Sequence, residues 1–240
     1  MDDQLCDPSS PSYPKWSVVD ALMYRLAPER FGGGKAHLTE YKEAWIVYNK
    51  MRIISEAAGA SIPADLLGCV AYNEVGGDPP FVKRDIVLPA RQFDWSGPDW
   101  VSRHLTITKP PQNTSEGAVK IQLRVAARQL KLDGNRLSFK QQDALTQCLE
   151  TDVFNLNIVA GLLRDLIKKD FPSAKTDNLT DEQFIVAGSR YNRGDARPLQ
   201  DFLDSLNDPP GTPRRSYSEY GRAMIRHRFR VRQLLWGQVP

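Results

Sequence analysis

The sequence predicts a mainly α-helical protein that forms one domain. Apolar residues recur at helical spacing in many segments, and no segment shows the alternation of a half-buried strand. The 240 residues are 41% hydrophobic and 25% charged, which is typical of a globular protein with a real core. No apolar run approaches the ~20 residues that cross a bilayer, so we expect no membrane insertion.

The N-terminal part is predicted to be a leader followed by two helices. Residues 1–15 are rich in proline, serine and aspartate and are expected to form a flexible leader before a domain at 16–240. The first helix is predicted over 39–60, from apolar residues at helical spacing. Pro63 opens the second helix, because proline suits the first helical position. That helix continues to Glu74 and ends at a glycine pair.

A long irregular stretch, 81–113, comes next and contains several prolines and aromatic residues. We interpret it as an insertion with a functional role, since long connections without regular structure often have one. It has room for a short β-hairpin, with strands near 85–88 and 105–108. Helical spacing returns in five later segments, 119–130, 138–149, 151–166, 180–191 and 218–236. In the fourth, Thr180 and Gln183 have the spacing of a capping box.

Charge is distributed unevenly along the chain. The net charge is +3, from 32 basic and 29 acidic residues. Between Arg214 and Arg232 lie seven arginines and one acid, Glu219, which gives 7 − 1 = +6 and leaves 25 − 28 = −3 for the rest. Two interpretations stay open. The arginines bind a polyanion, such as nucleic acid or an anionic wall polymer, or they pair with acids elsewhere in the protein.

Cysteine and histidine do not form a pattern typical of a metal site. The chain has three cysteines, Cys6, Cys69 and Cys148, three histidines, and no CxxC pair. We therefore expect no metal, no organic cofactor and no disulfide scaffold, although one bridge is compatible with an oxidising compartment. The first residues lack the cationic and apolar regions of a signal peptide, so we expect synthesis in the cytoplasm without one.

One glutamate stands out by its position. Leu67, Val70 and Glu74 share one helix face, so the carboxyl lies on the apolar stripe. Desolvation there and the negative end of the helix dipole both favour a neutral carboxylic acid, the form that protonates a glycosidic oxygen. Gly76 and Gly77 would leave room for a substrate beside the backbone. The alternative is a glutamate that only covers a helix end.

Three blocks of sequence carry a resemblance to a known family. In chain order they are AYNEVGG (71–77), TSEGAVKIQ (114–122) and AGSRYNRG (187–194). They resemble the signatures of the lysozyme-like superfamily, with goose-type lysozymes and soluble lytic transglycosylases nearest. The whole chain also resembles muramidase-type antibacterial effectors of Gram-negative bacteria. It departs from the family pattern at Gln122, which is displaced, and at Val75, where serine is usual.

The resemblance implies a single lysozyme-like catalytic domain and a role for each block. Glu74 is the general acid. Ser115 and Gln122 bind sugar hydroxyls or N-acetyl groups, and Gly76 and Gly77 admit the glycan. The hydroxyl of Tyr191 lies near the catalytic glutamate.

The other members of these blocks have structural alternatives. Asn192 either faces the cleft or caps the end of its helix, and Tyr191 is either functional or a core anchor. Ser115 and Gln122 are alternatively a helix N-cap and a solvent-facing helix residue.

A second catalytic carboxylate is the least defined part of the site. In inverting glycosidases a base holds a water about 6.5–9.5 Å from the acid. Asp94, which lies 94 − 74 = 20 residues after Glu74, is the candidate, with Asp85 and Asp99 as rivals. Goose-type enzymes place a base in a comparable loop, whereas lytic transglycosylases use one glutamate and the sugar's own 6-hydroxyl. Hydrolysis and transglycosylation both stay open.

By resemblance, the substrate is the peptidoglycan glycan strand, cut at the β-1,4 bond between N-acetylmuramic acid and N-acetylglucosamine. An effector of this kind travels through a secretion apparatus of the type VI kind and acts in the periplasm of a target bacterium. A cognate immunity protein protects the producer. A phage endolysin would share the chemistry.

Two other classes of function are considered. A cysteine amidase or peptidase would use Cys69 with His37, His104 or His227, but Cys69 lies mid-helix among apolar residues, where an inert thiol is expected. A nucleic-acid-binding protein would use the arginine segment, yet the sequence has no recognised nucleic-acid motif.

Overall fold

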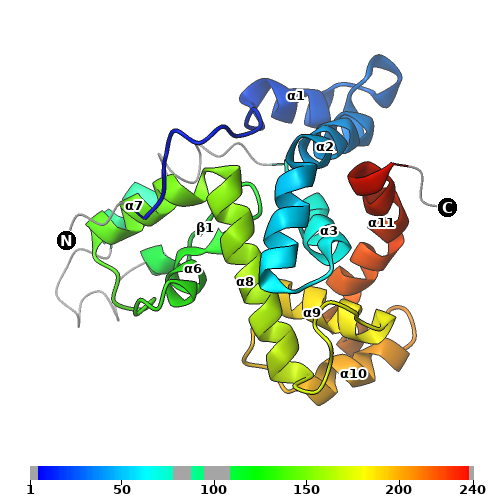
Figure 1. The fold of residues 1–240 in the computed structure, drawn as a ribbon. Helices are drawn as coiled ribbons and strands as arrows, with labels where there is room; N and C mark the ends of the chain where they lie inside the picture. The colour runs from blue at the N-terminus through cyan, green and yellow to red at the C-terminus, as the bar shows by residue number, and fades with distance from the viewer. Residues whose placement is uncertain (1–4, 78–87, 95–108, 238–240) are drawn as a thin grey trace. The chain divides into compact units, whose positions relative to one another are not determined.

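The computed structural model describes residues 5–77, 88–94 and 109–237. These residues are mainly helical, as the sequence predicts, with one short antiparallel pair of strands (Figure 1). Within the predicted domain they fall into two compact units, residues 1–42 with 75–155 and residues 43–74 with 156–240. The chain passes from the second unit to the first directly after Glu74.

The described part of the first unit contains short helices and a small hairpin. Its elements are α1 (Val18–Leu26), the 3-10 turn η1 (Glu29–Phe31), the N-terminal part of α2 (Gly34–Ala60), α4 (Leu88–Asp94), the 3-10 turn η3 (Pro111–Asn113), β1 (Ser115–Glu116), β2 (Ile121–Gln122), α6 (Leu123–Gln129) and α7 (Phe139–Leu149). The predicted start of α7 is confirmed, because Ser138 and Gln141 form a capping box there.

The described residues contain a short hairpin after the irregular stretch, at 115–122. β1 and β2 pair antiparallel, with Ser115 opposite Gln122. Residues 85–87 and 105–108 lie outside the described ranges, and Leu88 begins α4 instead of ending a strand.

The helix predicted over 119–130 starts later, at Leu123. Gly117 has φ +82°, a left-handed conformation that a right-handed helix cannot contain. Asn155 then satisfies the backbone of Val119: its Oδ1 accepts from the Val119 N–H at 2.7 Å, and its Nδ2 donates to the Val119 carbonyl at 3.1 Å. Tertiary hydrogen bonds therefore override the helical spacing of the apolar residues.

The N-terminal segment is fastened to the rest of the first unit. Cys6 forms a disulfide with Cys148 of α7. The Tyr13 N–H donates to Asp152 Oδ2 at 2.8 Å, and Trp16 is only 2% exposed. The segment that the sequence suggests is a flexible leader is thus held by covalent and polar contacts along its described part.

The second unit is organised around its last helix. It contains the C-terminal part of α2, α3 (Ala64–Glu74), most of α8 (Asp152–Asp170), α9 (Asp181–Arg193), α10 (Leu199–Asn207), the 3-10 turn η4 (Arg214–Tyr217) and α11 (Glu219–Trp236). α11 packs along α3 and α9, and α10 packs against α9. Its core includes Trp45, Ile53, Leu67, Val70, Phe184, Phe202, Met224 and Val231. Across the described ranges, no helix combines the length and apolar character that a membrane crossing requires.

The predicted capping box at the start of α9 (Asp181–Arg193) is confirmed. Thr180 Oγ1 accepts from the Gln183 N–H at 3.3 Å, and Gln183 Oε1 accepts from the Thr180 N–H at 3.0 Å. Gly194, with φ +83°, ends the helix. These contacts are local in sequence, which is why the pattern could predict them.

Two glycines bring α9 and α11 close together. A Cβ on Gly188 would lie 2.2 Å from Met224 Sδ, and one on Gly221 would lie 2.0 Å from the Ile185 carbonyl oxygen. The Gly221 N–H donates to Ser189 Oγ at 3.2 Å, which satisfies an N–H in the first turn of α11, where no intrahelical partner exists. The crossing is therefore fixed by close packing and by a hydrogen bond.

Candidate functional site

Glu74 is the last residue of a buried helix. Residues 65–72 of α3 are all buried, whereas Glu74 is half-buried. Val75 is 1% exposed, and Gly76 has φ +81°, so the helix cannot continue. The predicted end of this helix at Glu74 is confirmed, and the helix begins at Ala64, directly after Pro63.

Two tyrosines from different helices accompany the carboxyl. The Tyr220 hydroxyl of α11 donates to Glu74 Oε1 at 2.7 Å. The ring of Tyr191 in α9 lies beside that of Tyr220, with centroids 6.4 Å apart and planes inclined by 34°. A side-chain hydrogen bond also links Asn73 to Tyr220. We call these four residues the Glu74 cluster.

Both phenols of the cluster keep their protons at neutral pH. Desolvation by the surrounding protein, followed by the charge of Glu74, raises the pKa of Tyr191 well above its ordinary value of 10.0. The same two causes raise the pKa of Tyr220, with smaller contributions from Tyr191 and from the hydrogen bond to Glu74, while Asn73 opposes the rise. Tyr220 is therefore a hydrogen-bond donor to the carboxyl.

A buried ion pair holds the backbone next to Tyr191. Arg190 Nε lies 2.6 Å from Asp170 Oδ2, and its Nη2 donates to Asp170 Oδ1 at 2.9 Å. The guanidinium also lies 4.4 Å from the ring centroid of Phe202. Bidentate pairs of this kind fix orientation as well as distance. The end of α9 is thus tied to α8 and α10.

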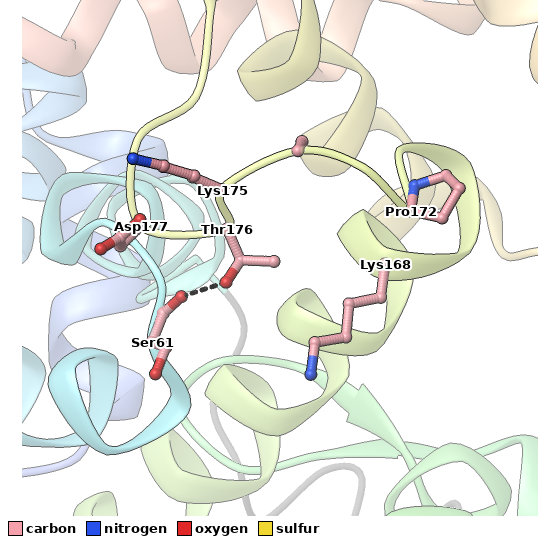
Figure 2. Close-up of a pocket in the computed structure, with 7 residues that line it drawn as sticks. Ser61, Lys168, Pro172, Lys175, Thr176 and Asp177 are labelled. Carbon is pink, nitrogen blue, oxygen red and sulfur yellow. Dashed lines mark hydrogen bonds between the residues drawn. The ribbon is translucent and has the colours of Figure 1, made fainter.

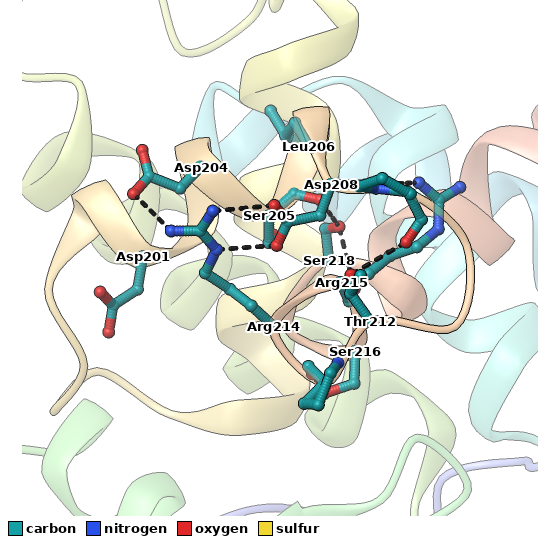
Figure 3. Close-up of polar contacts among 12 residues, drawn as sticks. Asp201, Asp204, Ser205, Leu206, Asp208, Thr212, Arg214, Arg215, Ser216 and Ser218 are labelled. Carbon is teal, nitrogen blue, oxygen red and sulfur yellow. Dashed lines mark hydrogen bonds and ion pairs between the residues drawn. The ribbon is translucent and has the colours of Figure 1, made fainter.

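A second polar network fixes the start of α11 (Figure 3). Arg214 Nε and Nη2 donate to the two carboxylate oxygens of Asp208 at 2.7 and 2.8 Å. Ser218 Oγ donates to the Ser205 carbonyl at 3.3 Å. These contacts set the path of the chain from α10 into α11, which begins one residue before Tyr220.

Sequence analysis did not single out Tyr220. It treated the last helix as a carrier of arginines. A signal was nevertheless present. Met224 and Val231, which are buried in α11, follow Tyr220 by 4 and 11 residues and therefore lie on the same helix face. A polar-tipped residue on the buried face of a helix is the same pattern that drew attention to Glu74.

The two glycines after Glu74 have different surroundings. A Cβ on Gly76 would lie 2.7 Å from Leu38 Cδ1 and 3.4 Å from atoms of both Trp16 and Tyr41. No described atom lies within 4 Å of one on Gly77. Among the described atoms, the space that the sequence predicts is open beside Gly77 and filled beside Gly76.

Ser115 and Gln122 are brought together by the hairpin. They are half-buried cross-strand neighbours in the first unit, whereas the cluster belongs to the second. Gln122 Oε1 accepts from Arg124 Nε at 2.9 Å. Because both residues lie in strands, the alternative roles of helix N-cap and solvent-facing helix residue are wrong.

Asn192 is exposed in the last turn of α9. Asp94 ends α4, and its side chain lies outside the described part of the structure, as do Asp85 and Asp99.

Cys69 does not have the surroundings of a nucleophile. It is a free cysteine with no exposed surface, and burial, followed by the charge of Asp65, raises the pKa of its thiol. His37 instead lies 3.0 Å from Asp20, and His227 packs against the ring of Tyr72. These contacts argue against the cysteine-enzyme interpretation.

The arginine segment is paired within the protein. Arg214 binds Asp204 and Asp208, Arg215 the Asp208 carbonyl, Arg222 the Leu206 carbonyl, Arg226 Glu219, Arg228 Asp65 and Asp181, Arg230 Glu43, and Arg232 Asp65. Four of the seven, Arg214, Arg228, Arg230 and Arg232, pair with acids outside the segment, which confirms that interpretation for these four. Arg226 pairs with Glu219 inside the segment, and Arg215 and Arg222 bind backbone carbonyls.

A pocket of about 570 Å³ lies at the C-terminal end of α8. Lys168, Lys175 and Ser61 are among its lining residues, and Thr176 Oγ1 donates to the Ser61 carbonyl at 2.6 Å (Figure 2). It shares no residue with the Glu74 cluster. Among the described residues, no three His, Cys, Asp or Glu side chains converge to hold a metal ion.

Comparison of the chain with models of protein families, with curated proteins and with solved structures finds no match. We therefore infer function below only from the sequence and the geometry of the Glu74 cluster.

Proposed function

We propose that this protein is a peptidoglycan-degrading muramidase with Glu74 as its general acid. One observation carries the proposal: a half-buried carboxyl at a helix end has one oxygen engaged by Tyr220, with Tyr191 beside it. Two of the three sequence blocks that resemble lysozyme-like enzymes supply Glu74 and Tyr191.

The cluster suits transfer of one proton to a glycosidic oxygen. In the proposed step the proton is donated from Oε2, the oxygen that Tyr220 does not engage. The neutral acid donates it to the bridging oxygen while the bond from the anomeric carbon to that oxygen breaks. The leaving sugar departs as an alcohol, and the carboxylate left on Glu74 faces the positive charge that develops on the reacting sugar. Water or the sugar's own 6-hydroxyl then attacks the anomeric carbon.

The proposed substrate is the β-1,4-linked glycan of peptidoglycan, and the proposed site of action is the periplasm of a target bacterium. The disulfide between Cys6 and Cys148 supports an oxidising compartment of this kind. As an effector, the protein would be carried by a secretion apparatus and neutralised in its producer by an immunity protein.

Glu74→Gln tests the proposal. The variant keeps the shape of the side chain and its acceptor for Tyr220 but cannot donate the acidic proton. We expect release of disaccharide-containing muropeptides from purified peptidoglycan to fall by roughly a hundredfold or more, with an unchanged circular dichroism spectrum. Glu182→Gln, at an exposed position of α9, is the matched control and should retain activity, as should Cys69→Ala.

Retained activity in folded Glu74→Gln, or its loss in Cys69→Ala, would overturn the proposal. Mass spectrometry of the wild-type products then identifies the second step. Reducing ends indicate hydrolysis, and 1,6-anhydro ends indicate transglycosylation.

A further inference from the structure

The described N-terminal residues 5–16, which we call the strap, are held at one end by a covalent bond. Cys6 is half-exposed and Cys148 is 5% exposed, so a thiol reagent can approach the bridge from the Cys6 side. Along the strap, Ser12 Oγ accepts from the Asp152 N–H at 3.0 Å, and Lys15 pairs with Glu150 at 2.7 Å. These partners lie at the end of α7 and the start of α8, close in sequence to Cys148.

The other end of the strap is a buried tryptophan. Trp16 packs edge-on against Tyr41, with centroids 4.9 Å apart, and against Tyr24. The Tyr41 hydroxyl in turn donates to the Pro14 carbonyl at 2.7 Å. The Trp16 indole N–H has no hydrogen-bond partner among the described residues. Burying an unpaired donor is costly. The buried position of Trp16 is therefore maintained by its packing and by the disulfide and hydrogen bonds that hold the strap.

Trp16 and Tyr41 form part of the wall behind Gly76. Atoms of both would lie 3.4 Å from a Cβ at that position. Gly76 belongs to the turn that ends α3, two residues after Glu74. The strap therefore supports the backbone immediately following the proposed general acid.

We propose that the Cys6–Cys148 disulfide is a redox latch for the site. With the bridge closed, the strap holds Trp16 against the turn after Glu74, and the enzyme is active. With the bridge open, the strap detaches, Trp16 leaves its place, and activity falls. The latch keeps the protein weakly active in a reducing compartment and fully active in an oxidising one. This inference rests on the proposed function.

The chemistry is reversible thiol–disulfide exchange. A dithiol reductant supplies two electrons and two protons: its thiolate attacks one sulfur of the bridge, the other sulfur leaves as a thiol, and the second reductant thiol displaces the remaining cysteine. A disulfide oxidant reverses both steps. Cys69 is buried and takes no part, so only one pairing is available to the folded chain.

Limited proteolysis of the full-length protein tests the strap without any substrate. We expect a dithiol reductant to speed cleavage within residues 5–16 by about tenfold or more, since a disulfide typically contributes more than a tenfold change in an equilibrium constant. Cys6→Ser, which alters a half-exposed residue outside the core, should be cut rapidly with or without reductant. Cys69→Ala should respond as the wild type does. Equal cleavage of the oxidised and reduced wild type would overturn the latch.

Muropeptide release under the same conditions tests the coupling to activity. We expect the reduced wild type and Cys6→Ser to be about tenfold or more slower than the oxidised wild type, and reoxidation to restore the wild type only. Full activity with a detached strap would overturn the latch and leave the proposed function standing. No activity in any state, together with a redox-dependent strap, would instead remove the proposed function and with it the coupling.

Discussion

The hydroxyl of Tyr220 makes the two carboxylate oxygens of Glu74 unequal, because it donates a hydrogen bond to only one of them. One oxygen is engaged at 2.7 Å, so the carboxyl cannot rotate freely and the second oxygen keeps a defined direction. Orientation of this kind is a large part of what an active site contributes. Tyr220 is thus a positioning residue of the proposed reaction, acting through Glu74.

Tyr220→Phe should lower kcat and change KM little. The variant loses a hydrogen bond to an acidic group, worth about 1.5–3 kcal/mol, which corresponds to roughly a tenfold to hundredfold lower rate. Tyr217→Phe is the matched control, because Tyr217 lies under Arg197 and does not belong to the Glu74 cluster. Equal losses in the two variants would show that the effect is not specific to the cluster.

The two tyrosines also predict a loss of stability at alkaline pH. Their pKa values are raised in the folded state above the ordinary 10.0, so the unfolded chain releases these protons first. Their contribution to stability is complete below pH 10.0 and is lost as pH rises through the raised values. Urea unfolding at increasing pH should show this decline, and Tyr220→Phe should make it less steep. An equally steep decline in the variant would contradict the assignment.

At the level of elements, the crossing of α9 and α11 determines where the cluster forms. Tyr191 lies three residues after Gly188, and Tyr220 lies one residue before Gly221. Because the two glycines allow the helices to approach, the tyrosine rings meet. A wider crossing would separate them.

Gly221→Ala should destabilise the protein by about 1–3 kcal/mol or more, because its Cβ would overlap the backbone of α9. Gly59→Ala is the matched control. It also replaces a helical glycine, yet no described atom lies within 4 Å of the added carbon, so the variant should be up to about 1 kcal/mol more stable. Chemical denaturation measures both. Similar effects in the two variants would show that the crossing tolerates a methyl group.

Elements set by local sequence could be predicted, and those set by distant contacts could not. The caps of α7 and α9 are formed by residues three positions apart; the sequence predicted the capping box of α9 and the start of α7. The start of α6 depends on Asn155, 36 residues from Val119, and apolar spacing alone predicted it wrongly. In the site, Glu74 and Tyr191 were predicted, whereas Tyr220 was missed because its partner is 146 residues away.

At the scale of the whole molecule, arginines of the basic segment join the last helix to α3. Asp65 of α3 is 2% exposed and accepts from both Arg228 and Arg232 of α11 at 2.7 Å. The C-terminal arginines therefore fasten the last helix to the one that carries Glu74. The distribution of charge along the sequence could not identify Asp65 as their partner, because Asp65 lies more than 160 residues before these arginines.

Asp65→Asn should cost about 3–5 kcal/mol of stability, because it removes the common partner of two guanidinium groups from a buried position. Asp165→Asn, which alters the exposed pair with Arg164, should cost about 0–1 kcal/mol. Thermal unfolding of the two variants compares them. A small effect at Asp65 would mean that packing alone joins α3 to α11.

Because Cys69 is buried, the number of cysteines that react with an alkylating reagent reports whether the protein is oxidised, reduced or unfolded. An alkylating reagent should add no label to the native oxidised protein, because two of its three cysteines are bridged and the third is buried. Opening the bridge exposes two sites for labelling, and unfolding under reducing conditions exposes all three. A single intact-mass spectrum can thus show how much of a preparation is disulfide-bonded, reduced but folded, or unfolded.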